Sequence, residues 1–341
     1  MSGGTDSSIA ALLLQRAGYE VIGVTFRFYE YNGQTDYLEK AVRLAEELHI
    51  HHEIHDYRET FRKEIITYFI DEYMAGRTPV PCTVCNNRFK WRLLAEIADA
   101  QNCNYIATGH YAQVRFYNRR HYIYKGVDPD KDQSFFLWGL PEEWLQRIVF
   151  PLGNYTKTYA KSLIENTSLE QAVIKKESTG VCFCPGDYRT FLRREVKEPI
   201  RPGFYRDSSG KIIGKHEGYP FYTVGQRRGL GIRFQYPIYV KEIIPVRNEV
   251  VLAPLQELYY TQMTLFPYHL VDAETDLVPD GKTICKIRYR KQATPCNLMR
   301  MANGELKVEL LEPLHAIAEG QAAAFYRGDR VIGGGIITGK Q

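Results

Sequence analysis

Two hydrophobic patterns divide the chain. Up to about residue 110, apolar residues alternate between helical spacing and short β-like runs. Helices are predicted near residues 7–17, 37–49, 59–74 and from about residue 86, with strands near 21–26 and 104–108. Such alternation predicts an α/β domain in which helices cover a mostly parallel sheet.

Beyond about Pro199 the pattern changes to short strand-like runs separated by Gly, Pro and Asn, without a long helical period. The runs are at 220–224, 238–240, 249–252, 283–287, 306–310 and 322–326. They predict two small β domains, the last barrel-like. We therefore expect an α/β catalytic domain over residues 1–198, a small central β domain over 199–256 and a β-barrel domain over 257–341.

Composition adds little about function. The 341 residues are 44% hydrophobic and 25% charged, which is typical of a globular protein with more than one domain. No apolar stretch is long enough to cross a bilayer and no secretion signal is visible, so we expect no membrane partner and a cytoplasmic location.

A net charge of +4 does not by itself indicate a nucleic-acid partner. Local basic clusters near tyrosines are more informative, since cations take phosphates and aromatic faces take unstacked bases. Any single cluster is more often a solvated surface pair. The clusters are Arg119-Arg120, Lys175-Lys176, Arg193-Arg194, Arg227-Arg228 and the run from Arg288 to Lys291.

A Ser/Gly loop, Ser2-Gly3-Gly4-Thr5-Asp6-Ser7-Ser8, stands directly before the first predicted helix. Paired glycines let the backbone approach a phosphate, and the helix N-terminus favours an anion. Asp6 could position a Mg²⁺ ion that bridges phosphate oxygens. A flexible turn that only caps the helix is the alternative, but the full motif favours a nucleotide site.

Seven cysteines, an odd number, argue against a disulfide framework in a chain without a secretion signal. Cys85 is expected at the mouth of the fourth helix, where the helix dipole lowers a thiol pKa. Together with Cys182 it could perform sulfur transfer, one thiol carrying a persulfide that the other attacks. A zinc site, an iron–sulfur cluster on Cys82, Cys85 and Cys182, and inert thiols remain open; inertness is favoured for Cys103, Cys285 and Cys296.

The Ser/Gly loop resembles the PP-loop of the ATP pyrophosphatase superfamily, which cleaves ATP between its α and β phosphates. This resemblance implies an adenine nucleotide α-hydrolase-like fold that binds ATP and Mg²⁺. In that superfamily a buried strand precedes the loop, whereas here the loop begins at residue 1. We expect the native product to start upstream; mass spectrometry of the endogenous protein tests this, and an N-terminus at Met1 would refute it.

The two cysteine segments resemble one particular family within this superfamily. Residues 76–86 resemble the segment of bacterial tRNA-specific 2-thiouridylases that carries the nucleophile, which falls on Cys85. Residues 178–183 are similar to the segment with their persulfide cysteine, which falls on Cys182. Val80 and Cys82 depart from the Asn-Pro-Asp often found in the family, so the iron–sulfur alternative stays open.

The resemblance covers essentially residues 1 to 338 and implies further roles. The family acts on the wobble uridine of a tRNA anticodon stem-loop and receives its sulfur from an upstream persulfide donor protein. The ATP-binding residues implied are Met1, Ser2, Gly3, Gly4, Thr5, Asp6, Ser7, Ser8, Phe26 and Gly109. The tRNA-binding residues implied are Val80, Pro81, Cys82, His110, Lys131, Asp132, Gln133, Arg288, Tyr289 and Gln321.

Two other functions compete with tRNA 2-thiolation. One is a PP-loop enzyme with a small-molecule substrate, which would cleave ATP without tRNA and without Cys85. The other is a catalytically idle tRNA-binding relative whose cysteines hold a metal, and the departures at Val80 and Cys82 keep it in view.

Overall fold

The computed structural model describes residues 1–167, 169–170, 180–279, 281–289 and 293–341. Lys175, Lys176, Ser178 and Thr179, and Arg290 and Lys291 of the last basic cluster, lie outside the described residues. The chain forms two compact units. The first comprises residues 1–65, 82–185 and 329–331, and the second comprises 66–81, 186–328 and 332–341.

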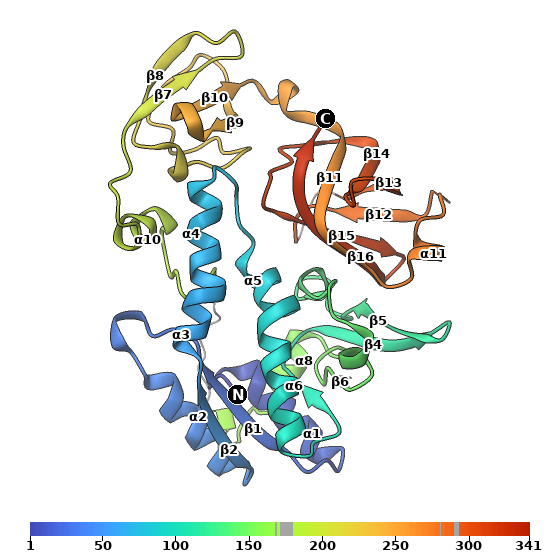
Figure 1. Cartoon of the computed structure of the whole chain (residues 1–341). Helices are drawn as coiled ribbons and strands as arrows, with labels where there is room; N and C mark the ends of the chain where they lie inside the picture. Colours follow the sequence, from blue (N-terminus) through green and yellow to red (C-terminus); the bar gives the residue numbers. More distant parts are fainter. Residues whose placement is uncertain (168, 171–179, 280, 290–292) are drawn as a thin grey trace. The chain divides into compact units, whose positions relative to one another are not determined.

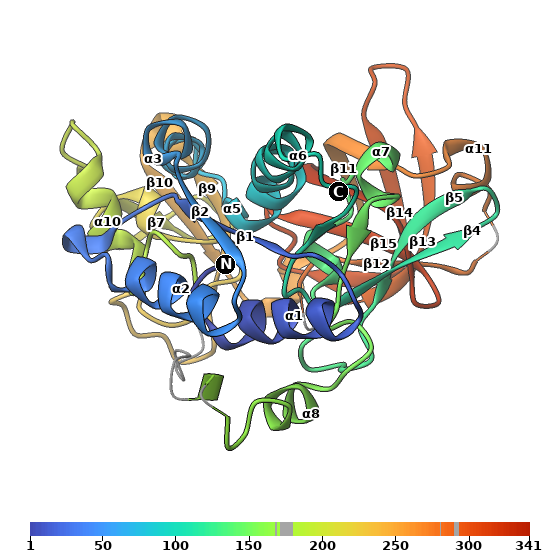
Figure 2. The same cartoon turned by 90° about the horizontal axis from the view of Figure 1, so that it is seen from below.

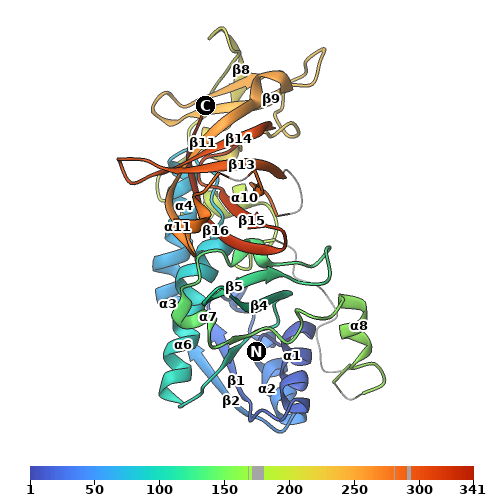
Figure 3. The same cartoon turned by 90° about the vertical axis from the view of Figure 1, so that its right-hand side faces the viewer.

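The first unit has the predicted α/β character (Figure 1). Strands β1 (Ile22–Arg27) and β2 (His51–Asp56) pair in parallel, and β3 (Ile106–Ala107) and β6 (Ile148–Val149) form a second parallel pair. Helices α1 (Thr5–Arg16) and α2 (Asp36–Glu47) lie on one side of β1 and β2, and α6 (Trp91–Ala100) lies on the other (Figures 2 and 3). A connecting 3-10 turn, η1 (Tyr31–Gly33), precedes α2.

Two predicted helices contain π-helical turns. The helix predicted over 59–74 consists of α3 (Arg58–Phe61), the π segment η2 (Arg62–Ile66) and α4 (Thr67–Met74). The helix predicted from about residue 86 begins earlier, with α5 (Pro81–Val84) and the π segment η3 (Cys85–Lys90) before α6. The predicted start was wrong, because proline is well suited to the first helical position.

An antiparallel hairpin inside this unit was not predicted. It consists of β4 (Ala112–Tyr117) and β5 (Arg120–Lys125) and turns at Asn118 and Arg119, both with positive φ. Such φ values at both central residues are what a tight two-residue hairpin turn requires. The remaining elements of the unit are η4 (Ser134–Phe136), α7 (Glu142–Leu145) and α8 (Lys157–Ser162).

The second unit contains a four-stranded sheet in the order β8-β7-β10-β9. The predicted strand at 220–224 is absent from it, and the chain there forms η5 (Tyr219–Phe221), since Pro220 has no N–H to donate to a ladder. The elements of this region are α10 (Tyr188–Glu195), β7 (Gly203–Arg206), β8 (Ile212–His216), β9 (Tyr239–Ile244), η6 (Pro245–Arg247), β10 (Glu249–Ala253) and η7 (Leu255–Leu258).

The predicted barrel is also present, drawn in orange and red in Figure 1. Its strands follow the order β11-β14-β13-β12-β15-β16, and β11 pairs again with β16, which closes the sheet on itself. The elements are β11 (Tyr259–Leu270), α11 (Ala273–Asp276), β12 (Thr283–Lys286), β13 (Ala293–Arg300), β14 (Leu306–His315), β15 (Ala322–Arg327) and β16 (Arg330–Lys340).

Each unit has its own hydrophobic core. In the first, Ile9 of α1 and Leu44 of α2 are fully buried together with Leu152. In the second, the barrel interior is filled by side chains such as Leu265 and Phe325. Within the described ranges, no helix has the length and apolar character needed to cross a membrane.

Candidate active site

The Ser/Gly loop closes on itself directly before α1. The hydroxyls of Ser7 and Ser8 each donate to the carbonyl of Gly4 at 3.0 Å. Gly3 has φ 69°, and a Cβ at this position would lie 3.0 Å from the carbonyl oxygen of Tyr37. Glycine is therefore required at position 3 by conformation and by space. The loop leads into the N-terminus of a 12-residue helix, where an anion is stabilised.

Gly109 lies against this loop. A Cβ on Gly109 would approach the main-chain carbonyl of Asp6 to 2.8 Å, so only glycine allows the two segments to touch. The Asp6 carboxylate accepts hydrogen bonds from the Tyr111 hydroxyl at 3.1 Å and from the Lys157 ammonium at 2.5 Å. The structure thus brings the predicted residues Asp6 and Gly109 together and adds two neighbours that the sequence did not reveal.

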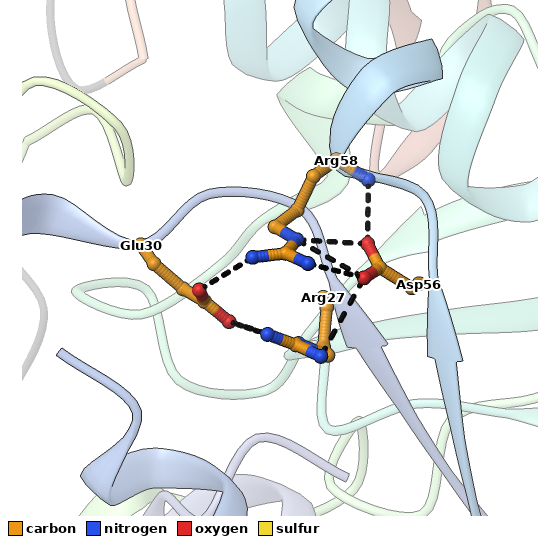
Figure 4. Close-up of polar contacts among 4 residues, drawn as sticks. All are labelled: Arg27, Glu30, Asp56 and Arg58. Atoms are coloured by element: carbon orange, nitrogen blue, oxygen red, sulfur yellow. Dashed lines mark hydrogen bonds and ion pairs between the residues drawn. The ribbon is translucent and has the colours of Figure 1, made fainter. Parts of the chain in front are cut away.

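A ring of ion pairs lies at the carboxyl ends of β1 and β2, directly after Phe26 (Figure 4). Arg27 and Arg58 both bind Glu30, at 2.7 and 2.8 Å, and Arg58 binds Asp56 at 2.6 Å. Hydrogen bonds from Arg58 lower the pKa of the Asp56 carboxyl to about 2. This edge of a parallel sheet is where α/β proteins bind their ligands. The ion pairs hold the segment from Arg27 to Glu30 against Asp56 and Arg58 at this edge.

Three thiols gather around one lysine. Cys82 and Cys85 come from the helical stretch that begins at Pro81, and Cys182 comes from a turn about a hundred residues later. Burial raises the pKa of Cys85 to about 11. Cys182 is exposed as a residue, but the protein atoms around its sulfur displace water from it and raise its pKa to about 12; the positive charge of Lys90 opposes both shifts. The sulfurs of Cys85 and Cys82 also raise the pKa of Cys182, so the three are electrostatic neighbours.

The expected lowering of the Cys85 pKa by a helix dipole is wrong. Because the helix begins at Pro81, Cys85 lies in its second turn and not at its mouth. The dipole effect is confined to the first turn, and burial dominates. Ligand-free Cys85 is therefore a protonated thiol at neutral pH, and Lys90 is the group that favours its thiolate.

His110 connects the thiols to the nucleotide loop. Its Nε2 lies 3.5 Å from Nζ of Lys90, and its Nδ1 lies 2.6 Å from Oγ1 of Thr108. Burial, helped by Lys90, lowers the pKa of His110 well below its usual value, so the ring is neutral. An ammonium can only donate, so Nε2 accepts and Nδ1–H donates to Thr108. Since Gly109 touches Asp6, a continuous set of contacts joins the loop to Cys85.

An aromatic cluster brings the two cysteine segments together. Phe61 of α3 is 1% exposed; its ring centroid lies 5.6 Å from that of Phe89 and 5.8 Å from that of Phe183. Phe89 follows Cys85 within the π segment, and Phe183 follows Cys182 in its turn. Phe61 therefore contacts both segments, and neighbouring rings at these distances stabilise one another.

The zinc and iron–sulfur alternatives can be compared with the arrangement of the described cysteines. All seven cysteines are free thiols. Among the residues that the structure describes, no three His, Cys, Asp or Glu side chains are arranged to hold a metal ion.

Residues 131–133 are tied to the segment after β3. The main-chain N–H of Tyr111 donates to Oε1 of Gln133 at 3.0 Å, and that of Gln133 donates back to Tyr111 at 2.8 Å. Asp132 is buried and accepts from the N–H and the hydroxyl of Ser134. The N-cap residue of η4 is Gln133, and Asp132 holds the start of η4 from one residue earlier. The paired contacts between Gln133 and Tyr111 hold Lys131 beside the segment that carries His110.

The other predicted tRNA-binding residues belong to the second unit. The side-chain amide of Gln321 donates to the carbonyls of Thr78 and Pro79 at 3.0 and 3.1 Å, immediately before Val80 and Pro81. Gln321 is thus engaged in positioning this segment.

Arg288 and Tyr289 follow β12, and the side chain of Arg288 is exposed. A Cβ on Gly225 would lie 3.4 Å from Nη2 of Arg288, so this arginine extends beside the central sheet region.

Sequence reasoning missed Lys90, Lys157 and Phe61. Lys157 is 151 residues from Asp6, and nothing in its local pattern marks it. Lys90 had a signal, since its charge lies five residues after Cys85, but an isolated lysine in a helix is ordinarily solvated.

Family models match almost the whole chain in three pieces. A tRNA methyl transferase HUP domain matches residues 1–186, a tRNA methyl transferase PRC-barrel domain matches 189–254, and an aminomethyltransferase β-barrel domain matches 263–337. Together with the parallel strands and the closed barrel, they define a class: tRNA-modifying enzymes with a nucleotide-binding HUP domain followed by two β domains.

Curated relatives identify the family. The chain is 56% identical to tRNA-specific 2-thiouridylase MnmA 2 of Phocaeicola vulgatus over 99% of this chain and 96% of that protein. It is 53% identical to MnmA 1 of Bacteroides fragilis with the same coverage, and 42% identical to MnmA 3 of P. vulgatus. The chain belongs to the tRNA-specific 2-thiouridylase family, which confirms the resemblance seen in its motifs.

Among solved structures, a U34-tRNA thiolase NcsA from Methanococcus maripaludis with its [4Fe-4S] cluster matches with a TM-score of 0.35 and 18% identity. The match covers 57% of this chain and 62% of the NcsA chain. A likeness of this size bears on neither fold nor chemistry.

Proposed function

We propose that this protein is a tRNA-uridine 2-sulfurtransferase that converts the wobble uridine of an anticodon stem-loop to 2-thiouridine, with ATP cleaved to AMP and pyrophosphate. Family membership supports the tRNA substrate and the use of ATP. The observation that carries the site assignment is the set of contacts from Asp6 through Gly109, His110 and Lys90 to Cys85. A phosphate-binding loop next to clustered thiols suits activation followed by sulfur transfer.

In the first stage, the loop residues 1–8, Phe26 and Gly109 bind ATP, whose Mg²⁺ neutralises phosphate charge. The uridine O2 attacks the α-phosphorus and releases pyrophosphate. Adenylation converts a poor leaving oxygen into AMP. Because Lys157 already pairs with the Asp6 carboxylate at 2.5 Å, Asp6 binds a metal only if this contact changes when ATP enters.

In the second stage, Cys182 carries a persulfide that a donor protein supplies, and Cys85 attacks it so that sulfur reaches the activated carbon. Cys182 is exposed, as a site loaded by another protein must be, whereas Cys85 is half-buried. The uridine must leave the anticodon stack to reach these thiols. An iron–sulfur cluster on Cys82, Cys85 and Cys182 is the alternative route, and iron analysis of anaerobically purified protein tests it.

We further propose a division of labour among the domains. Residues 1–198 perform the chemistry, while 199–256 and 257–341 bind the tRNA through exposed cations such as Arg288. Val80, Pro81, Cys82, His110, residues 131–133, Tyr289 and Gln321 complete the tRNA site. Because the proposed reaction consumes ATP and tRNA, we expect the protein to act in the cytoplasm.

The test is mass analysis of tRNA nucleosides after single substitutions in cells that lack the native gene. Cys85→Ser and Cys182→Ser should each abolish 2-thiouridine while the purified variants still bind ATP. Cys103→Ser is the matched control, because this partly buried thiol lies outside the cluster and should leave 2-thiouridine unchanged. Wild-type levels of 2-thiouridine in either cluster variant would overturn the assignment.

A further inference from the structure

Neither stage of the proposed reaction uses the charge of Lys90, although the backbone geometry directs this residue to the nucleophile. It ends the π segment that begins at Cys85. In an α-helix, five residues turn by about 500°, which would leave the two side chains about 140° apart around the axis. The wider turn with i→i+5 hydrogen bonds brings residues 85 and 90 back to nearly the same side, and such turns are frequent at functional sites.

The surroundings of Lys90 are unusual for a lysine. In the part of the chain that the structure describes, it pairs with no carboxylate, and its ammonium lies 3.5 Å from Nε2 of His110. Burial lowers the pKa of Lys90, and the groups that oppose this shift are the sulfurs of Cys85, Cys82 and Cys182, with Cys85 the strongest. A half-buried cation whose electrostatic neighbours are all thiols is suited to compensating the negative charge that appears when one of them becomes a thiolate.

We propose that the ammonium of Lys90 is the electrostatic partner of the transferring sulfur and stabilises the negative charge that moves from Cys85 to the departing hydrosulfide. This inference rests on the proposed roles of Cys85 and Cys182. His110, neutral and held by Thr108, orients the ammonium by accepting one of its hydrogen bonds.

The Cys85 thiolate attacks the inner sulfur of the Cys182 persulfide and forms a Cys85–Cys182 disulfide. The sulfur–sulfur bond of the persulfide breaks, and its electron pair leaves with the outer sulfur as HS⁻, which adds to the adenylated carbon as AMP departs. One negative charge is present before and after the transfer, and Lys90 keeps its proton. A dithiol reductant then supplies two electrons to restore both thiols.

Three variants test this role. Lys90→Met removes the charge at similar volume, Lys90→Arg keeps it, and Arg88→Met removes an exposed cation from the same π segment as the matched control. The readouts are the pH dependence of Cys85 alkylation by iodoacetamide, resolved by peptide mass spectrometry, and the single-turnover rate of tRNA thiolation. Thermal unfolding and ATP binding show that each variant is folded.

Lys90→Met should move the midpoint of Cys85 alkylation to higher pH and slow single-turnover thiolation about 100-fold. Lys90→Arg should retain the wild-type midpoint and a rate within about tenfold of wild type. Arg88→Met should match wild type in both measurements.

An unmoved alkylation midpoint in Lys90→Met overturns the inference, whether or not thiolation is lost. If Lys90→Met does not fold, Lys90→Arg provides the test. A midpoint of Cys85 alkylation that moves to higher pH in Lys90→Arg, although the positive charge is retained, also overturns the inference. These outcomes are separate from failure of the proposed function, which would show as 2-thiouridine persisting in Cys85→Ser or Cys182→Ser.

Discussion

At the scale of single residues, two glycines determine how closely the chain packs around the nucleotide loop. Gly3 needs its positive φ, and Gly109 needs the absence of a side chain beside Asp6. The two requirements differ physically, because the one at Gly3 is conformational as well as steric and the one at Gly109 is steric alone. Each restrains a different side of the same turn.

Gly109→Ala should weaken ATP binding by at least about tenfold, because its Cβ would come within 2.8 Å of the Asp6 backbone and displace the loop. Isothermal titration with a non-hydrolysable ATP analogue measures this. Gly18→Ala is the control: Gly18 also has a positive φ, but nothing lies within 4 Å of its added Cβ. It should cost about 1 kcal/mol of stability and leave affinity unchanged. Equal affinity in both variants would contradict the steric argument.

A second residue-scale prediction follows from the buried thiol. With the pKa of Cys85 raised to about 11, the reactive thiolate is a small fraction at neutral pH. The single-turnover rate of enzyme already loaded with persulfide should therefore rise about tenfold per pH unit from 7 to 9. Rapid-quench assays on preloaded enzyme and adenylated tRNA measure it. A rate that is flat over this range would mean that another step, or a thiolate already formed, governs the transfer.

At the scale of elements, the aromatic cluster determines the spacing of the two cysteine segments. Phe61 comes from the helical stretch after β2, Phe89 from the π segment and Phe183 from the turn at 181–184. A short bridge between Val181 and Cys184 closes the turn. The buried Phe183 ring anchors it to the cluster.

Phe183→Ala should lower the effective concentration of Cys182 relative to Cys85 by at least about tenfold, since the truncated side chain no longer fills the cluster. Equilibration of the Cys85–Cys182 disulfide against glutathione measures this quantity directly. Phe116→Ala is the control, because that ring is 67% exposed on the β4–β5 hairpin. An unchanged disulfide equilibrium in Phe183→Ala would show that the turn is positioned by other contacts.

Comparison of sequence and structure shows which elements carry a local signal. Helix α2 and strand β1 were predicted correctly because their apolar residues repeat at the spacing of their own structure. Strand β2, with the sequence His-His-Glu-Ile-His-Asp, was missed because only its pairing with β1 makes it a strand. The start of α5 at Pro81 was also missed, and with it the true position of Cys85 within its helix.

The residues of the candidate site also fall into those with a local sequence signal and those that only tertiary packing brings together. Motifs indicated the loop, both cysteine segments and Gly109 without any structure. Contacts between distant segments, such as Lys157 with Asp6 and Phe61 with Phe183, depend on tertiary packing that no local pattern encodes. Lys90 was missed because the π turn that aligns it with Cys85 is not evident from apolar spacing.

At the scale of the whole molecule, a buried histidine makes stability depend on pH. His216 in β8 is 4% exposed; its Nδ1 accepts from the N–H of Gly218 at 3.0 Å, and its ring packs against Tyr205 and Tyr222. Burial lowers the pKa of His216 to about 4. Below pH 6.5 the unfolded chain binds a proton that the folded protein refuses, so stability falls as the pH drops from about 6.5 to about 4.

The loss attributable to His216 should be on the order of 3 kcal/mol across this window. Urea unfolding at several pH values measures it. In His216→Gln, whose amide oxygen can still accept from Gly218, the acid dependence should become shallower by about this amount even if stability at pH 7 is lower. Parallel curves for the variant and the wild type would show that other groups cause the acid sensitivity.

The pairing of β16 with β11 has a consequence for biosynthesis. These are the first and last strands of the barrel in chain order, separated by the whole of its sequence. Until the ribosome has made β16, the backbone N–H and C=O groups of β11 and β15 that pair with β16 remain unpaired. Unpaired strand edges of this kind can pair with other chains and cause aggregation. Nascent chains stalled before β16 should therefore depend on chaperones, whereas a released chain completes the cylinder by itself.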